Sequence, residues 1–235
     1  MGADGSFAKD AWSEPKRRRC ASSLTDIRPT RIEWAARDGD VRGLSSELKS
    51  LTVRHDVFVT KTNQGAPKWT CSMCGDEHEG LATVFGWMTP YAWFIDERSD
   101  KRKGDCDGDM CLMTDRKGGT HGYIRGHLRL RVHDPDQDYF TWSVWVELAK
   151  DEFNLNSDHW EDPERAQLLP SPGHLATVLP YEQETLGLRV RLFNREPGVV
   201  PLVKLDRDQD HPLVAEQRQG ISLHRVTEIN EQLLH

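Results

Sequence analysis

Apolar and polar residues alternate along several segments in the second half of the chain, which is the pattern of half-buried β-strands. Between Tyr123 and Val132 apolar side chains occupy even-numbered positions, and basic side chains occupy most of the odd-numbered ones. The same alternation of apolar residues returns over 142–148 and 186–192. We therefore predict three strands here, one of which has a notably basic face.

A fourth strand is predicted over 199–205, where Pro201 favours the edge of a sheet because proline has no N–H to donate. Apolar residues at helical spacing predict a helix around 150–160 and a closing helix after Ser222, whose hydroxyl is suited to cap it. Strands and helices do not alternate regularly. We therefore expect an α+β fold with a mainly antiparallel sheet.

The first part of the chain has a different pattern. Residues 1–28 mix Gly, Ser, Asp, Pro and basic residues without periodicity, which predicts a disordered tail. Over 29–56, apolar residues at helical spacing are interrupted at Asp38-Gly39-Asp40, which predicts a short N-terminal helical hairpin. The remaining residues, 57–235, are expected to form one α+β domain, to which the hairpin is an extension.

Composition narrows the range of partners. The net charge is -7, so the overall field does not attract nucleic-acid phosphates or anionic lipid. No apolar run approaches the roughly 20 residues needed to cross a bilayer, and none follows the basic run Lys16–Arg19 as a secretory signal would require. We therefore expect a cytoplasmic protein that has no membrane contact, and composition disfavours nucleic acid as its partner.

Four of the five cysteines fall into two pairs. Two residues lie between Cys71 and Cys74 and a glycine follows the pair, so both thiolates can reach one tetrahedral ion, as in a zinc knuckle. Cys106 and Cys111 follow in a Gly/Asp-rich loop and would complete a closed structural zinc site. Their spacing is wider than in the commonest knuckles, so the fourth ligand stays open between Cys106 and His78.

Two other interpretations of the cysteines compete with zinc. A redox dithiol at Cys71 and Cys74 calls for a helix N-terminus after a strand, whereas Pro67, Lys68 and Trp69 precede this pair. Free cysteines can also be buried as small hydrophobic side chains. An odd number of cysteines without a secretory signal favours metal chemistry over a disulfide framework.

Several short motifs carry a family resemblance from about Cys71 onward. They are Cys71-Ser-Met-Cys74-Gly-Asp-Glu-His78, Asp109-Met-Cys111, Ile124-Arg-Gly126, Trp142-Ser-Val-Trp145-Val, and Asp210-His-Pro-Leu213 leading through Glu216-Gln217 to Gly220-Ile-Ser222. The chain thereby resembles an uncharacterised, largely bacterial family, domain of unknown function 2199. The resemblance implies that Cys71, Cys74, Cys111 and His78 are recurring elements, and it says less for Cys106.

A second polar cluster lies near the C-terminus and contains Asp208, Asp210, His211 and Glu216. An aspartate beside a histidine could orient the imidazole for general-base work, and Glu216 could take a proton. His211 could also reach the metal. Adjacent residues rarely bond in that way, and His-Pro is an ordinary start for a turn before a helix. Asp210, His211 and Glu216 are therefore candidates for catalysis beside a purely structural interpretation.

The basic strand face could meet phosphates or an acidic partner, because side chains two apart on a strand share one face. Its members are Arg125, His127, Arg129, Arg131 and His133. Interleaved aromatic residues of the kind that stack bases are not evident there. A solvated face balanced by the many Asp and Glu residues is the alternative.

Three functions follow from these features. The first is a zinc-stabilised binding or regulatory module, which contacts another protein through the N-terminal hairpin or the basic strand face. The second is a metal-dependent enzyme in which His78 or His211, with Asp210 or Glu216, handles protons. The third is an accessory protein that binds a toxin, nucleic acid or another enzyme through the basic face. Signatures of nucleotide binding, acyl transfer and zinc proteases are missing from the sequence.

Overall fold

The computed structural model describes residues 57–59, 68–70, 77–95, 104–115, 118–135 and 137–234. The fold of these residues is α+β, as predicted. The strands are β1 (Val57–Val59), β2 (Lys68–Thr70), β3 (Glu77–Glu79), β4 (Val84–Trp87), β5 (Asp105–Cys106), β6 (Met110–Thr114), β7 (Thr120–Arg131), β8 (Tyr139–Leu148), β9 (Ser171–Leu175), β10 (Arg189–Phe193) and β11 (Leu202–Leu205). The helices are α2 (Ala92–Ile95), α3 (Lys150–Asp158), the 3-10 helix η2 (Arg165–Gln167), α4 (Pro212–Gln219) and α5 (Leu223–Leu234).

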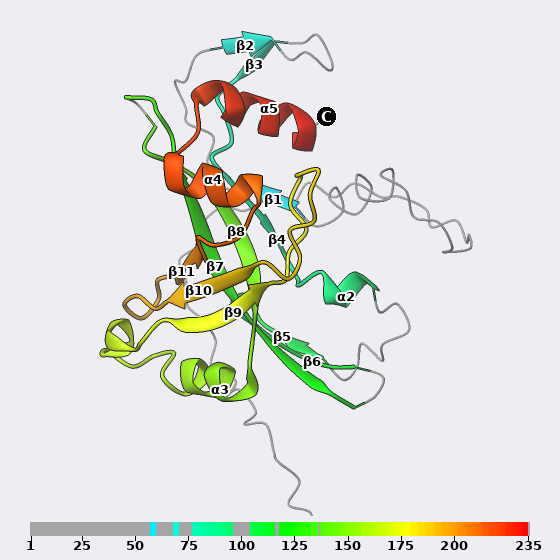
Figure 1. Ribbon diagram of the computed structural model, residues 1–235, viewed down its shortest axis with the longest axis vertical. Helices are drawn as coiled ribbons and strands as arrows, with labels where there is room; N and C mark the ends of the chain where they lie inside the picture. Colours follow the sequence, from blue (N-terminus) through cyan, green and yellow to red (C-terminus); the bar gives the residue numbers. More distant parts are fainter. Residues whose placement is uncertain are drawn as a thin grey trace, which may run out of the picture.

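Nine strands form one mixed sheet in the order β1-β4-β8-β9-β10-β11-β7-β6-β5, and β2 and β3 pair separately. Most neighbouring strands run antiparallel, while β4 with β8 and β11 with β7 run parallel. The longest pairing is the β7–β8 hairpin, whose register runs from Gly122 opposite Leu148 to Arg131 opposite Tyr139. The sheet is therefore built around this hairpin (Figure 1).

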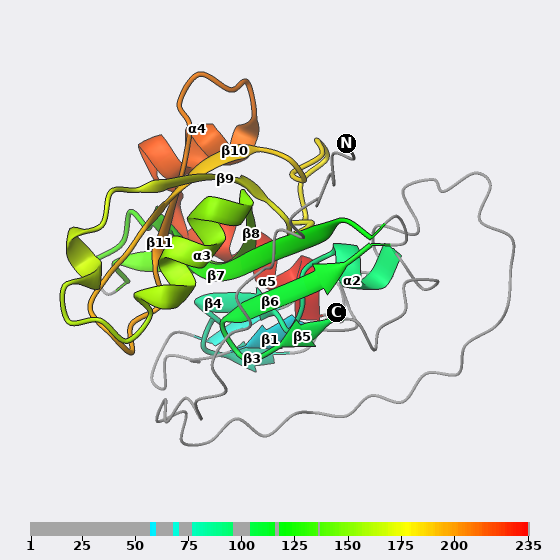
Figure 2. The same cartoon turned by 90° about the horizontal axis from the view of Figure 1, so that it is seen from below.

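Five of these strands close into a barrel because β7 pairs with both β8 and β11. The ring runs β7-β8-β9-β10-β11 and returns to β7, where the N–H of His127 donates to the carbonyl of Pro201 at 2.7 Å. Gly126 allows this close approach, since a Cβ there would meet Val203 and lie 3.2 Å from Leu192. Figure 2 shows the curved strands β9, β10 and β11 completing the ring.

The core extends from the barrel to the layer under the C-terminal helices. Phe85 of β4 lies 5.8 Å from Phe140 and 6.0 Å from Trp142 of β8, measured between ring centroids. These three side chains are fully buried. Asn230 of α5 is also buried and bonds both backbone groups of Ala82, so α5 is fixed to the chain just before β4. Helices α4 and α5 lie together over this end of the sheet (Figure 1).

Most of the predicted elements are confirmed. Strands β7, β8 and β10 and helix α3 lie in the segments where periodicity predicts them. In α5, Val226 and Ile229 are fully buried, and the hydroxyl of Ser222 accepts a hydrogen bond from the N–H of Arg225 at 3.2 Å. The predicted cap of the closing helix is therefore also present.

The predicted edge position of the fourth strand is wrong. Strand β11 lies between β10 and β7 and completes the barrel. Pro201 precedes the strand instead of lying in it, so its missing N–H removes no ladder hydrogen bond. The barrel itself is not predicted by the sequence.

Two predictions concern the N-terminal part of the chain. The tail over 1–28 and the helical hairpin over 29–56 lie outside the described residues. Among the helices that the structure does describe, none has the length and apolar character needed to cross a membrane.

The closure at Gly126 can be tested with a double-mutant cycle. Gly126→Ala should lower the free energy of unfolding by about 1–3 kcal/mol, because the new methyl group meets Val203. In Val203→Ala the clashing methyl groups are gone, so the two changes together should cost about 1 kcal/mol less than the sum of the single changes. Gly108→Ala is the control, since nothing lies within 4 Å of its Cβ position. Additive urea denaturation energies would contradict this account.

Candidate functional site

Cys106 and Cys111 face each other across the β5–β6 hairpin. The N–H of Asp107 donates to the carbonyl of Met110 at 2.9 Å, and the carboxylate of Asp107 accepts from the N–H groups of Asp109 and Met110. The next pair along the ladder is Cys106 and Cys111, whose Cα atoms are 4.0 Å apart. A pair that exchanges no backbone hydrogen bonds brings its side chains close together. The turn thus places two sulfurs side by side.

The structure joins these two sulfurs in a disulfide bond. A thiolate, and not a disulfide, is the form of cysteine that binds a metal. Cys106 and Cys111 can therefore serve as metal ligands only after reduction. Cys111 is fully buried and Cys106 is partly buried, so the pair lies against the body of the protein.

The other predicted ligands lie at a second hairpin. Strands β2 and β3 pair with Trp69 opposite His78, and the segment between them, which is outside the described residues, contains Cys71 and Cys74. Figure 1 draws β2 and β3 at the end of the molecule beyond α5, away from β5 and β6. Within the described parts of the chain, no three His, Cys, Asp or Glu side chains are grouped so as to hold a metal ion.

His211 lies at the start of α4 and is buried. Its Nδ1 accepts a hydrogen bond from the N–H of Leu213 at 3.0 Å, which caps the helix. Its Nε2 is left to donate to the carbonyl of Gln183 at 3.4 Å. Asp210 is exposed, and the structure gives it no hydrogen bond to His211. Both ring nitrogens of His211 therefore have backbone partners.

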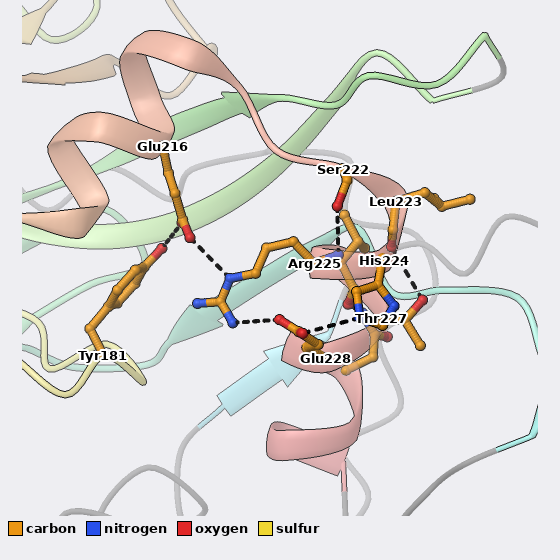
Figure 3. Close-up of polar contacts among 10 residues, drawn as sticks. Tyr181, Glu216, Ser222, Leu223, His224, Arg225, Thr227 and Glu228 are labelled. Atoms are coloured by element: carbon orange, nitrogen blue, oxygen red, sulfur yellow. Dashed lines mark hydrogen bonds and ion pairs between the residues drawn. The ribbon is translucent and has the colours of Figure 1, made fainter.

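Glu216 joins three separate segments through its carboxylate (Figure 3). The hydroxyl of Tyr181 donates to Oε2, and Nε of Arg225 donates to Oε1 at 3.0 Å. Arg225 also donates to Glu228 at 3.1 Å. Burial and the carboxylate of Glu216 raise the pKa of Tyr181, so its hydroxyl stays protonated as a donor. These contacts fasten the loop before β10 to α4 and α5.

The predicted basic stripe on β7 divides into parts with different surroundings. The guanidinium of Arg125 lies 4.9 Å from the ring centroid of Trp145 and 3.4 Å from the carbonyl oxygen of Met88. His133 donates from Nε2 to the carbonyl of Gln219 at 2.8 Å. Arg129 and Arg131 between them reach the surface. Contacts within the protein therefore engage Arg125 and His133 at the two ends of the stripe, whereas Arg129 and Arg131 are accessible to a ligand.

One cluster is missed by the sequence reasoning. His121 of β7 lies between two carboxylates, with Nδ1 2.7 Å from Glu147 and Nε2 3.2 Å from Asp115. Burial lowers the pKa of His121, but the hydrogen bonds that its ring donates to Glu147 and Asp115, together with their negative charges, outweigh burial and raise the pKa overall. Only the cross-strand register brings Glu147 here, so no local motif marks the cluster. The carboxylates bind opposite nitrogens, and the arrangement is an ionic bridge between strands.

Comparison with known protein families gives a match over much of the chain. Residues 70–221, more than half of the chain, match the family described as uncharacterized protein conserved in bacteria (DUF2199). No curated protein and no solved structure matches the chain. The matched segment includes both cysteine pairs and Glu216, and the family description names no activity.

The bridge at His121 predicts a pH dependence. Since its folded pKa is raised, the bridge should stabilise the protein fully below the ordinary histidine pKa of about 6.5 and lose this effect as the pH rises through the folded pKa. The three side chains are more than a third exposed, so the effect should stay below about 1 kcal/mol. Glu147→Gln should lower the pKa of His121 in an NMR titration, while Glu182→Gln should not. An unchanged value in both variants would contradict the bridge.

The role of Glu216 can be tested through stability. Its side chain is 19% exposed, so Glu216→Gln should lower the free energy of unfolding by about 1–3 kcal/mol, because a charged acceptor for two donors is lost. Glu228→Gln is the matched control, since Glu228 also bonds Arg225 but is 46% exposed, and should cost less than about 1 kcal/mol. Equal losses in urea denaturation would argue against a fastening role.

Proposed function

The chain belongs to the DUF2199 family of uncharacterized bacterial proteins, and we propose that it is a binding module stabilised by a zinc ion at its cysteine-bearing hairpins. The observation that carries this proposal is the position of Cys106 and Cys111, which flank the turn of β5 and β6 as a cross-strand pair. Cys71 and Cys74 lie in the segment that connects a second antiparallel pair, β2 and β3. Both cysteine pairs thus belong to hairpins.

A hairpin is a suitable holder for two thiolates. With zinc–sulfur distances of about 2.3 Å and tetrahedral angles, two sulfurs on one ion lie roughly 3.8 Å apart. Cα atoms 4.0 Å apart allow that separation through ordinary rotation of both side chains. The hydrogen bonds to Asp107 fix the backbone of the β5–β6 turn in advance, so at this hairpin binding would require ordering of the side chains alone.

Two ligand sets follow from the proposal. In the first, Cys71, Cys74, Cys106 and Cys111 hold one ion, and the β2–β3 hairpin has to move beside β5 and β6. In the second, Cys71, Cys74 and Cys111 bind the ion with His78 as the fourth ligand, which requires the same approach of the two hairpins. In both sets the ion would link the start of the family domain to the β5–β6 hairpin, which adjoins the barrel strand β7.

A binding or regulatory role fits this site better than catalysis. Four protein ligands leave no open position on zinc for water. The candidate proton-handling residues are also committed elsewhere, since His211 has backbone partners at both nitrogens and Glu216 is held by Tyr181 and Arg225. A zinc ion closed in this way would contribute free energy of folding and no chemistry.

The test is a metal analysis of the purified, reduced full-length protein. Wild type should carry one zinc per chain, and a chelator should lower its melting temperature. Cys71→Ser/Cys74→Ser should lose the metal in both ligand sets. Cys106→Ser should lose it only in the all-cysteine set, and His78→Ala only in the mixed set. Cys20→Ser is the matched control and should keep the metal, because Cys20 belongs to neither pair.

Each outcome has a definite consequence. Wild type without stoichiometric metal, or with a melting temperature that a chelator leaves unchanged, would overturn the proposal. Retention of zinc in Cys111→Ser would remove the β5–β6 hairpin from the site and with it the observation on which the proposal rests.

A further inference from the structure

The middle of the β7 stripe and one neighbouring loop together carry three arginines that reach the surface. Arg131 is exposed, and Arg129 and Arg195 are partly exposed. Arg195 follows β10, and its charge reaches His127 of β7. We refer to Arg129, Arg131 and Arg195 as the basic patch. The patch contains no cysteine and does not depend on the proposed metal site.

The basic patch differs from the arginines of the neighbouring barrel strand. On β10, Arg189 pairs with Asp208 at 2.7 Å and Arg191 pairs with Asp206 at 3.4 Å. Among the described residues, no carboxylate forms an ion pair with any member of the patch. Within the part of the chain that the structure describes, carboxylates therefore pair with the arginines of β10 and form no ion pair with the basic patch.

The strand register explains why no carboxylate of β8 lies directly opposite the two arginines of β7. Across β8, Arg129 lies opposite Thr141 and Arg131 lies opposite Tyr139. An opposite charge directly across two strands is the usual way to balance a charged strand residue. Here the cross-strand positions hold a hydroxyl and an aromatic ring, so positive charge accumulates on this face.

The positive charge on this face also affects the pKa of His127. Its pKa is lowered to about 4, first because it is buried and then because Arg129, Arg195 and Arg125 oppose a further positive charge. His127 therefore stays neutral near pH 7, and the arginines carry the charge. The positive charge next to the neutral imidazole of His127 therefore comes from arginine side chains, among them Arg129 and Arg195 of the basic patch.

We propose that the basic patch is a docking surface for an acidic segment of a partner protein. Complementary charge is the basis of this assignment. Arg129 and Arg131 are two residues apart on a strand, so their backbones are separated by about 6.8 Å. Carboxylates on alternate residues of an extended peptide repeat at the same interval, so such a peptide can place one carboxylate against each arginine.

The surroundings favour an acidic peptide over single-stranded nucleic acid. Nucleic-acid surfaces of this kind need open aromatic faces on which bases stack. Trp145 is fully buried, and Tyr139, although 47% exposed, has the guanidinium of Arg129 5.7 Å from its ring centroid.

Fluorescence anisotropy with the full-length protein at low salt tests the assignment. The probe is a labelled peptide of about ten residues in which Glu and Ser alternate, so that the carboxylates repeat at the spacing of the arginines. Arg129→Glu/Arg131→Glu should weaken its binding by about tenfold or more, and added salt should weaken the wild type. Arg207→Glu reverses one charge, as each of the two patch substitutions does, at an exposed turn residue outside the patch, and it should alter binding by less than about twofold.

Circular dichroism checks that the variants are folded, and Arg129→Gln/Arg131→Gln serves if charge reversal prevents folding. Absence of peptide binding by wild type at low salt would overturn the proposal, as would equal weakening by Arg207→Glu. Tighter binding of a thymidine oligonucleotide of equal length, lost in the same patch variant, would replace the peptide with nucleic acid and also overturn it. The metal content of each variant is measured in parallel, so a failure here is distinguishable from a failure of the zinc proposal.

Discussion

Strand β7 holds the fold together because it has bonded partners on both of its edges. It pairs along its length with β8, and on the other edge with β6 and then β11. The pairing with β11 closes the barrel, which removes the free edges that five strands would otherwise expose. Gly126 permits this closure, since its missing side chain gives Val203 the space it occupies. The strands outside the barrel continue the same sheet: β6 and β5 extend it from β7, and β4 and β1 extend it from β8.

The two faces of β7 have opposite roles as a result. Ile124, Leu128 and Leu130 point into the core and are fully buried, whereas the alternate residues carry charge. The charged face is not uniform, because each residue meets a different cross-strand neighbour. His121 meets carboxylates, Arg125 packs on Trp145, and Arg129 and Arg131 have uncharged neighbours. One alternating segment therefore supplies an ionic bridge, a packing contact and a basic surface.

The periodicity of the sequence predicts those features of the fold that depend on local spacing, namely individual strands, their buried faces and the starts of helices. The alternation from Tyr123 to Val132 predicts β7 and identifies its buried side, and Ser222 marks the start of α5. Partners distant in sequence are not predicted in this way. The wrong edge position of β11 and the missed bridge at His121 share this cause, since both depend on which strand lies alongside.

The candidate sites also differ in whether their residues are close together or far apart in the sequence. The sequence identifies Cys106 and Cys111 as a pair, and the hairpin turn brings their sulfurs together, because the pair is local. From the sequence, Glu216 and His211 are equal candidates for proton transfer. In the structure, Tyr181 and Arg225 from other segments bond to Glu216, which gives Glu216 a structural role. The family match assigns no activity that would override these contacts.

A chain with a net charge of -7 can still present a basic surface, because charges separated by more than about 8 Å are largely screened at physiological salt. What matters to an incoming ligand is the charge within that range. Around Arg129 this charge is carried by guanidinium groups, which stay protonated over the whole physiological range. His127 among them is neutral, while Asp115 and Glu147 raise the pKa of His121 at the other end of β7. The bridge at one end of the strand therefore changes with pH, and the surface at the other end keeps its charge.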